Sequence, residues 1–206
     1  MQLVGTLHDN LVVDRRIQVL ASHLTRLIPD GSHVLDVGCG DGSLDCVIAS
    51  RLARVSIEGI DVLVRPDARI PVRIFNGRDI PYADASFDAV IFVDVLHHAE
   101  DPKAVLREAI RVGKTILIKD HFKDGFLAGP TLRFMDWVGN ARHGVALPYN
   151  YWTTEEWKRT FSQLGLSVEE MNLSLGLYPQ IVAWIFERRL HFIARLVSAQ
   201  SGQTSR

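Results

Sequence analysis

The feature that most constrains this chain is a short apolar run that ends in a cluster of glycines. Residues 32–42 read SHVLDVGCGDG, so Gly38, Gly40 and Gly42 directly follow the apolar stretch that ends at Val37. Such a run predicts a buried strand that enters a glycine turn before a helix. Because glycine lacks a Cβ, the turn can adopt positive φ and let a ligand approach its N–H groups. We therefore expect a nucleotide-like ligand here, and a purely structural turn is the alternative.

The spacing of the glycines indicates which ligand the turn accepts. A dinucleotide site has the pattern G-x-G-x-x-G with its third glycine inside the helix, whereas here the glycines alternate with other residues. Asp36 in the strand and Asp41 in the turn would repel a pyrophosphate, and they favour a cationic ligand with hydroxyl and ammonium groups. Asp61 ends the next apolar run about 20 residues later, where nucleotide-binding α/β folds carry a ribose-binding carboxylate. The same spacing disfavours an NAD-linked reductase.

Strand-like and helix-like segments alternate over the first part of the chain. Apolar runs predict strands at residues 34–37, 55–62, 71–75, 87–93 and 114–120. Helical patterns and capping residues predict helices at residues 14–28, 43–52 and 101–112. This alternation predicts an α/β fold with a parallel, doubly wound sheet.

The last third of the chain changes character. A connection over residues 121–152 is longer than loops usually run, and it should hold a short helix at 131–138. The sequence TTEE from Thr153 is a capping-box pattern that predicts another helix. A sixth strand, a helix and a seventh, antiparallel strand are then predicted at residues 166–173, 177–189 and 190–197. For the last two segments, one continuous helix is the alternative.

The composition fits a single globular domain. The chain has 206 residues, of which 47% are hydrophobic and 23% charged. A formal net charge of -1 gives no basic footprint for nucleic acid, and no apolar run is long enough for a transmembrane segment. Cys39 and Cys46 are interpreted as packed thiols in a reducing compartment. We therefore expect a cytoplasmic protein.

Four stretches, in this order, resemble motifs of the class I S-adenosylmethionine (SAM)-dependent methyltransferases, in particular the small-molecule "type 11" members. They are the glycine loop, the acid at Asp61, the sequence FNGRDIPYADASFD from Phe75 to Asp88, and VDVLHH from Val93 to His98. Asn76 departs from the family pattern, which has an aspartate that accepts from the adenine amino group. The departure is mild because an amide oxygen also accepts hydrogen bonds.

The resemblance implies a Rossmann-like, mostly parallel seven-stranded sheet with helices on both faces, and SAM as the cofactor with S-adenosylhomocysteine as its product. It implies one methyltransferase domain, made of a helical cap (1–31), a cofactor-binding half (32–120), a lid (121–152), a C-terminal half (153–197) and a flexible tail (198–206). The predicted cofactor residues are Asp36, Gly38, Cys39, Gly40, Asp61, Val62, Asn76, Gly77, Val93 and Asp94.

The expected reaction is methyl transfer to a small or lipid-like acceptor that is apolar or aromatic. A SAM- or nucleotide-binding partner module without activity is the alternative. The candidate catalytic residues are His97, His98 and His121, because histidine titrates near neutral pH. We assign His97 as general base, His98 as its packing partner and His121 as the runner-up; catalysis by proximity alone is the alternative. No metal is expected, because adjacent histidines should point in different directions.

The lid and the C-terminal stretch carry the remaining expectations. Gly and aromatic residues in the lid suggest an acceptor pocket with Trp137, Tyr149 and Tyr151 as wall residues. Residues 177–196 combine large apolar side chains with arginines, which fits the edge of the core, a self-association face or a peripheral lipid-contacting surface. The chain is expected to be a monomer or a homodimer.

Overall fold

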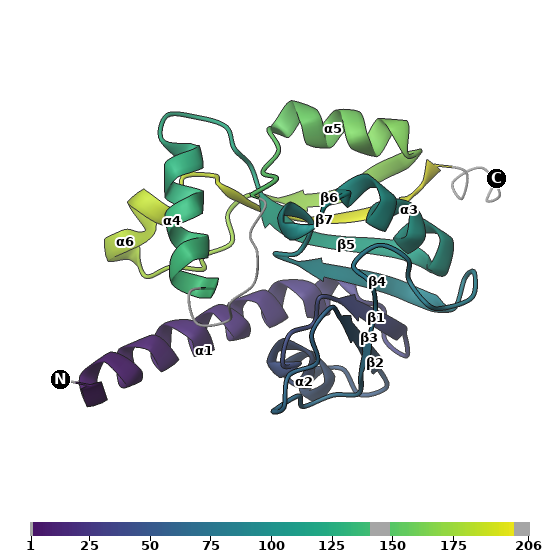
Figure 1. Ribbon diagram of the computed structural model, residues 1–206, viewed down its shortest axis with the longest axis horizontal. Helices are drawn as coiled ribbons and strands as arrows, with labels where there is room; N and C mark the ends of the chain where they lie inside the picture. Colours follow the sequence, from purple (N-terminus) through teal and green to yellow (C-terminus); the bar gives the residue numbers. More distant parts are fainter. Residues whose placement is uncertain (1, 141–148, 200–206) are drawn as a thin grey trace.

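Seven strands form one sheet that organises the whole chain (Figure 1). The computed structural model describes residues 2–140 and 149–199. Part of the predicted lid, residues 141–148, and most of the predicted tail, residues 200–206, lie outside the described residues. The strands are β1 (His33–Val37), β2 (Ser56–Asp61), β3 (Val72–Ile74), β4 (Phe87–Val93), β5 (Gly113–His121), β6 (Leu166–Asn172) and β7 (His191–Ser198).

The strand order is β3-β2-β1-β4-β5-β7-β6. The first five strands pair in parallel, whereas β7 pairs antiparallel with both β5 and β6. The order reverses between β1 and β4. The chain segments that follow these two strands therefore leave in opposite directions, which opens a crevice at the carboxyl ends of β1 and β4. The predicted doubly wound, mostly parallel sheet is confirmed, and the alternative of one helix over residues 177–197 is wrong.

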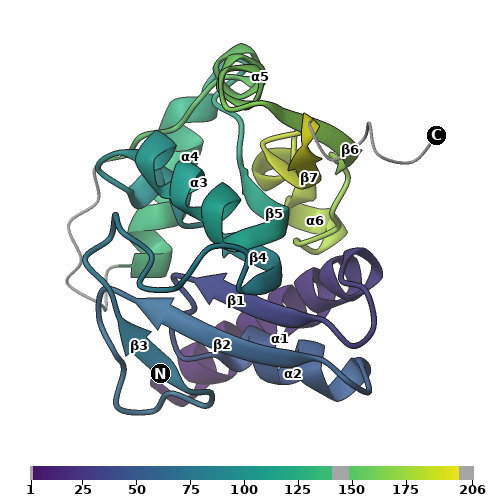
Figure 2. The same ribbon diagram turned by 90° about the vertical axis from the view of Figure 1, so that its right-hand side faces the viewer.

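Helices cover both faces of the sheet, as Figure 2 shows. The helices are α1 (Gln2–Leu27), α2 (Ser43–Arg51), η1 (Leu96–His98), α3 (Pro102–Val112), α4 (Ala128–Asn140), α5 (Thr154–Gln163) and α6 (Gln180–Phe186). On one face α1 and α2 bury an apolar cluster that includes Leu24, Ile48 and Ile91. On the other face α3 and α5 close a second cluster around Leu106 and Phe192. The strands are therefore buried on both sides, as their apolar sequences predict.

Capping residues fix where the helices start. The Asp101 side chain accepts a hydrogen bond from the Ala104 N–H at 3.0 Å, one residue before the Pro102 that begins α3. Thr153 and Glu156 form the predicted capping box of α5. At α2, Asp41 accepts from the Ser43 N–H at 3.0 Å.

Three elements differ in length from their predictions. Helix α1 begins at Gln2 rather than at residue 14, α4 extends to Asn140, and α6 spans only Gln180–Phe186. Helix α6 ends early because Arg188 and Arg189 adopt positive φ, and the chain then turns into β7. Among the described residues, no helix combines the length and the apolar character needed to cross a membrane.

Candidate functional site

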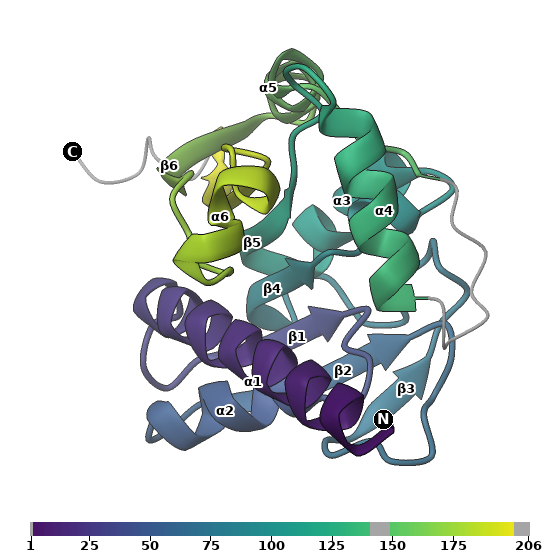
Figure 3. The same cartoon turned by 90° about the vertical axis from the view of Figure 1, so that its left-hand side faces the viewer.

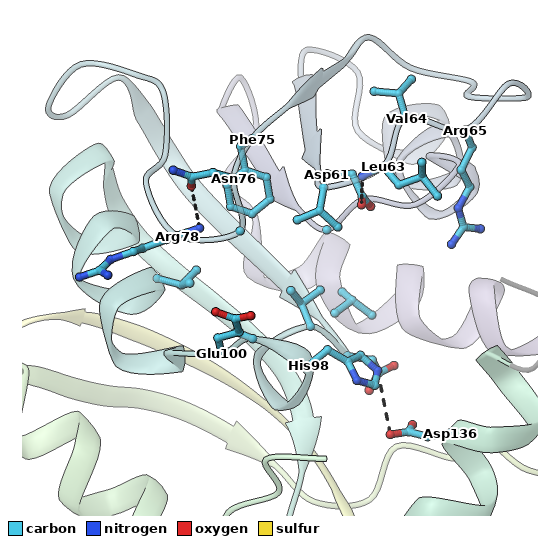
Figure 4. Close-up of a pocket in the computed structure, with 18 of the residues that line it drawn as sticks. Asp61, Leu63, Val64, Arg65, Phe75, Asn76, Arg78, His98, Glu100 and Asp136 are labelled. Atoms are coloured by element: carbon cyan, nitrogen blue, oxygen red, sulfur yellow. Dashed lines mark hydrogen bonds and ion pairs between the residues drawn. The ribbon is translucent and has the colours of Figure 1, made fainter. Parts of the chain in front are cut away.

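A cavity of about 970 Å³ opens at the carboxyl ends of the strands, where the strand order reverses. Figure 4 shows its wall, with Asp61 and Phe75 on one side and His98 and Asp136 on the other. The predicted site residues that line it are Gly38, Asp61, Val62, Asn76, Gly77, Val93, Asp94, His98 and His121. The structure therefore brings together residues from five separate stretches of the sequence.

The glycine turn lines the cavity at Gly38, where there is no space for a side chain. Gly38 has φ of 77°, and a Cβ built on it would lie 2.5 Å from Cγ2 of Val95. Its N–H donates to the Ile60 carbonyl oxygen at 2.7 Å, which ties the turn to β2. The backbone at Gly38 therefore faces the cavity directly, in a conformation that favours glycine.

Asp61 lies at the end of β2 with its carboxylate held in place. One oxygen accepts from the Gly40 N–H at 2.9 Å and the other from the Leu63 N–H at 3.1 Å. Each carboxylate oxygen has a second lone pair, so both can still accept from a ligand. The arrangement is a fixed acceptor pair for two hydroxyl groups, as the sequence predicts for a ribose.

Asn76 lies in the cavity wall but is engaged with its own turn. Its Oδ1 accepts from the Arg78 and Asp79 N–H groups at 2.9 and 2.7 Å, and its Nδ2 donates to Asp79 Oδ2 at 2.8 Å. The predicted acceptor for an adenine amino group is thus already used twice. Phe75 and Val62 give this end of the cavity an apolar surface against which a flat base can pack.

Asp36 lies behind the turn and does not line the cavity. It is buried beside Asp45 of α2; burial and the neighbouring carboxylate raise the pKa of Asp36 well above its ordinary value. Burial also raises the pKa of Asp45 to about 7. Two carboxyl groups in this position hold at least one proton at neutral pH. Asp36 would therefore act on a ligand only through the turn.

Cys39 and Gly40 do not line the cavity either. Cys39 packs against β2, where a Cβ on Gly59 would lie 2.4 Å from its sulfur. Burial and three neighbouring carboxylates raise the pKa of the Cys39 thiol, so it stays protonated. Gly40 contributes through its N–H, which orients Asp61.

A partly buried cluster of charged residues lies at the ends of β4 and β5. Asp94 forms ion pairs with Arg16 of α1 and with Lys119 of β5. Burial opposes ionisation of Asp94, but the charges of Lys119 and Arg16 outweigh it and hold its pKa below the ordinary range. Arg16 and Asp94 both line the cavity. This end of the site is polar, with one carboxylate between two basic side chains.

His97 is buried behind the cavity wall and does not line it. Its Nδ1 lies 2.7 Å from Asp120 Oδ1, and its Nε2 lies 3.2 Å from Asp136 Oδ2. Burial alone would lower the pKa of His97, but the charge and hydrogen bond of Asp120, together with Asp136, raise it to about 10. His97 is therefore an imidazolium at neutral pH, and the geometry argues against its assignment as general base.

His98 and His121 do reach the cavity. The ring centroids of His97 and His98 are 3.9 Å apart, and His98 Nε2 lies 4.0 Å from Asp136 Oδ2 (Figure 4). Burial and the charge of His97 lower the pKa of His98. Burial and the charge of Lys119 lower the pKa of His121 well below its ordinary value. Both rings are therefore neutral near pH 7 and able to accept a proton.

None of the three predicted wall residues lines the cavity. The Trp137 side chain is 61% exposed on the outer face of α4. Tyr151 is buried, stacks on the His97 ring with centroids 5.1 Å apart, and donates a hydrogen bond to Asp136. Tyr149 packs behind it. Instead, the described wall of the cavity near His98 includes Met135, Asp136 and Tyr178.

Sequence reasoning missed Arg16, Asp136 and Tyr178. Asp136 lies in the helix predicted at residues 131–138, next to Trp137, which is the predicted wall residue. Successive residues of a helix are rotated by about 100°, so one of two neighbours can face the cavity while the other faces solvent. Arg16 follows Arg15 on an amphipathic helix, and no signal in the sequence distinguishes the two arginines. No motif in the sequence distinguished Tyr178.

The histidines and carboxylates around His97 include groups of side chains that could bind a metal ion together. Two groups have ligand atoms within 4.8 Å of one another: His97, Asp120 and His121, and His97, His98 and Asp136. The adjacent histidines therefore do not diverge as the sequence analysis assumed. In the structure, Asp120 and Asp136 already lie 2.7 and 3.2 Å from the two ring nitrogens of His97.

Both the sequence and the fold match known proteins. The family model described as "Methyltransferase domain" matches residues 12–171. The O-methyltransferase rstn1 of Aspergillus nomiae is 32% identical over 136 residues, 55% of this chain and 60% of the relative. The chain spans about half the length of the curated relatives it matches.

Two solved structures share the fold at low identity. An S-adenosylmethionine-dependent methyltransferase from Mesorhizobium loti has a TM-score of 0.63 and 16% identity, covering 85% of this chain and 96% of that one. The [4+2]-cyclase SpnF has a TM-score of 0.64 and 18% identity, covering 89% and 81%. The same fold thus carries proteins that are named for different reactions.

Proposed function

Since the chain belongs to the class I SAM-dependent methyltransferases, we propose that it transfers a methyl group to a hydroxyl-bearing, largely apolar small molecule or lipid. The observation that supports this most is the neutral His98 beside Asp136, across the cavity from Asp61. On this proposal His98 is the proton acceptor at one end of the cavity, and Asp61 is the acceptor for ribose hydroxyls at the other.

The residues of the cavity fit the cofactor of the family. The exposed backbone of Gly38 leaves room for the methionine part, Asp61 offers two fixed acceptors for the ribose hydroxyls, and Phe75 with Val62 offers an apolar surface for adenine. Bound SAM would supply a methyl group on sulfonium, which is already a strong electrophile. The protein then has to align the acceptor, exclude water and remove a proton.

His98 replaces His97 as the proposed general base. An acceptor hydroxyl placed near the cavity end would give its proton to His98 Nε2, 4.0 Å from the Asp136 carboxylate. The lowered pKa of His98 keeps the ring unprotonated and ready to accept. His97 would act as a fixed cation that orients Asp120 and Asp136, with no part in proton transfer.

The wall near His98 supports an apolar or aromatic acceptor. Met135, Ala99 and Val95 give that region apolar surface, and the Tyr178 ring is half-buried beside it. Beside this apolar surface, Arg16, Asp94 and Asp136 supply polar groups that can orient a hydroxyl group. A phenol or another hydroxyl on an apolar skeleton matches this arrangement.

The function is tested by binding and then by transfer. Isothermal titration calorimetry with SAM and S-adenosylhomocysteine measures the cofactor site, and methyl-labelled SAM with fractionated extracts identifies the acceptor. We expect His98→Ala to lower turnover by about 10²-fold to 10⁴-fold with little change in cofactor affinity. His33→Ala, at a half-exposed histidine paired with Glu58, is the matched control. Equal turnover in both variants would remove the base assignment.

A SAM-binding module without activity remains the competing function. It predicts calorimetric binding of SAM with no labelled product from any extract fraction. A labelled product that depends on His98 would exclude it.

A further inference from the structure

Large apolar side chains gather on one outer face of the protein, beside the cavity. We define the α4–α6 face by Phe126 and Leu127 before α4, Phe134 and Trp137 on α4, and Ile181 and Trp184 on α6. Phe126, Ile181 and Trp184 have exposed fractions of 87%, 82% and 72%. Exposed apolar clusters of this kind usually mark an interaction site, because leaving them in water is unfavourable.

The two parts of the face are joined in space. The Arg188 guanidinium, just after α6, donates to the Thr131 hydroxyl on α4 at 2.8 Å and to the Phe126 carbonyl oxygen at 3.5 Å. On α4 the rings of Phe134 and Trp137 lie 6.4 Å apart. Figure 3 looks onto this end of the molecule and shows both helices in front of the sheet.

The charges on this face are mainly positive. Among the described side chains of residues 123–137 and 180–189, the exposed charged residues are Lys123, Asp124, Arg133, Arg188 and Arg189. The single exposed carboxylate among them, Asp124, accepts hydrogen bonds from the N–H and hydroxyl groups of Thr154. Glu187 is half-buried and accepts from the Tyr178 N–H at 3.1 Å. The chain as a whole has a formal net charge of -1, so the cationic character is local. Tryptophan, aliphatic residues and arginine together are the composition of protein surfaces that lie in a lipid headgroup region.

From this composition we propose that the α4–α6 face docks on a membrane surface that contains anionic lipids. The apolar side chains would enter the headgroup boundary and the arginines would pair with phosphate groups. A second copy of the chain fits less well, because a two-fold contact through this face would bring arginines against arginines. The inference goes beyond methyl transfer and needs neither SAM nor an acceptor.

Docking through this face would also bring the cavity to the membrane. The residues Met135 and Asp136, which line the cavity, lie on α4 between Phe134 and Trp137, and Tyr178 lies just before α6. A lipid-like acceptor could then reach His98 without crossing water. This consequence rests on the proposed function, whereas the docking itself does not.

The test is sedimentation with sucrose-loaded vesicles of phosphatidylcholine alone and of phosphatidylcholine with phosphatidylglycerol, at low and high salt. We expect binding to the anionic vesicles that weakens with salt. The Ile181→Ser/Trp184→Ser double variant should bind at least about tenfold more weakly, because two large side chains no longer leave water. Val168→Ser/Met171→Ser, at two exposed apolar residues of β6, is the matched control and should bind like the parent.

Arg189→Glu keeps the apolar residues and should also lower binding to anionic vesicles. Circular dichroism and SAM calorimetry show that each variant is folded. No binding of the folded parent to anionic vesicles, or equal binding of the parent and the Ile181/Trp184 variant, would overturn the proposal. A dimer detected by light scattering that disappears in that same variant would assign the face to a second copy instead. A failure of methyl transfer would leave the vesicle result unaffected.

Discussion

Replacing His97 by glutamine should destabilise the protein strongly and remove part of its pH dependence. His97 is 1% exposed and lies between Asp120 and Asp136, and its pKa rises from 6.5 to about 10 on folding. A rise of that size corresponds to roughly 5 kcal/mol at about 1.4 kcal/mol for each tenfold change. We expect a measured loss of about 3–5 kcal/mol, the usual cost of breaking a buried ion pair.

The direction of the pH effect follows from the raised pKa. The folded protein binds the His97 proton more tightly than the unfolded chain, so this contribution is fully present below pH 6.5. It is lost as the pH rises from 6.5 towards 10. Lys119, His121 and His191 have lowered pKa values and change stability in the opposite direction, so the curve of the parent alone is not diagnostic. The difference between the parent and His97→Gln isolates the His97 contribution.

The measurement is urea unfolding followed by tryptophan fluorescence at several pH values between 6 and 10. The gap in unfolding free energy between the parent and His97→Gln should be largest at pH 6 and shrink as the pH rises. A His97→Gln/Asp120→Asn double variant should regain part of the loss, because the uncompensated carboxylate is removed. His33→Gln at the surface serves as control. A gap that is constant over this range, or a His97 ring found neutral by NMR at pH 7.5, would refute the reasoning.

Three further predictions concern the cofactor turn. Gly38→Ala should lower stability and SAM affinity more than Gly31→Ala does. Both glycines have φ of 77°, but only at Gly38 would the new Cβ lie 2.5 Å from Val95. Calorimetry and thermal unfolding compare the two variants, and equal effects would mean that backbone strain alone matters. Asp61→Ala should weaken SAM binding by about 1.5–3 kcal/mol for each charge-assisted hydrogen bond lost, with Asp61→Asn intermediate, and an unchanged calorimetric affinity would remove the ribose assignment. Asp45→Asn should raise the unfolding free energy at pH 8 and make it depend less on pH. The pKa of Asp45 is raised to about 7 in the folded protein, so the parent loses stability as the pH rises through 7. An unfolding free energy equal to that of the parent at both pH 5 and pH 8 would contradict this.

The strands of the sheet could be predicted from the sequence alone, and so could several residues that line the Asp61 end of the cavity. Apolar runs and glycine turns are local signals, so they placed β4 at Phe87–Val93 and the start of α3 at Pro102 without knowledge of the rest of the chain. The glycine turn and Asp61 could be predicted for the same reason, since each follows directly on a strand. The carboxyl ends of parallel strands then meet by topology alone.

The roles of the residues at the His98 end of the cavity depend on contacts between distant parts of the chain. His97 and His98 are adjacent in the sequence, yet one is a buried cation and the other a neutral ring at the cavity wall. That difference arises because Asp120 from β5 and Asp136 from α4 approach His97 from distant parts of the chain. A pKa depends on burial and on charges within a few ångströms, and neither can be read from local pattern. The choice between Asp136 and Trp137 as the wall residue likewise depended on how α4 is rotated against the sheet.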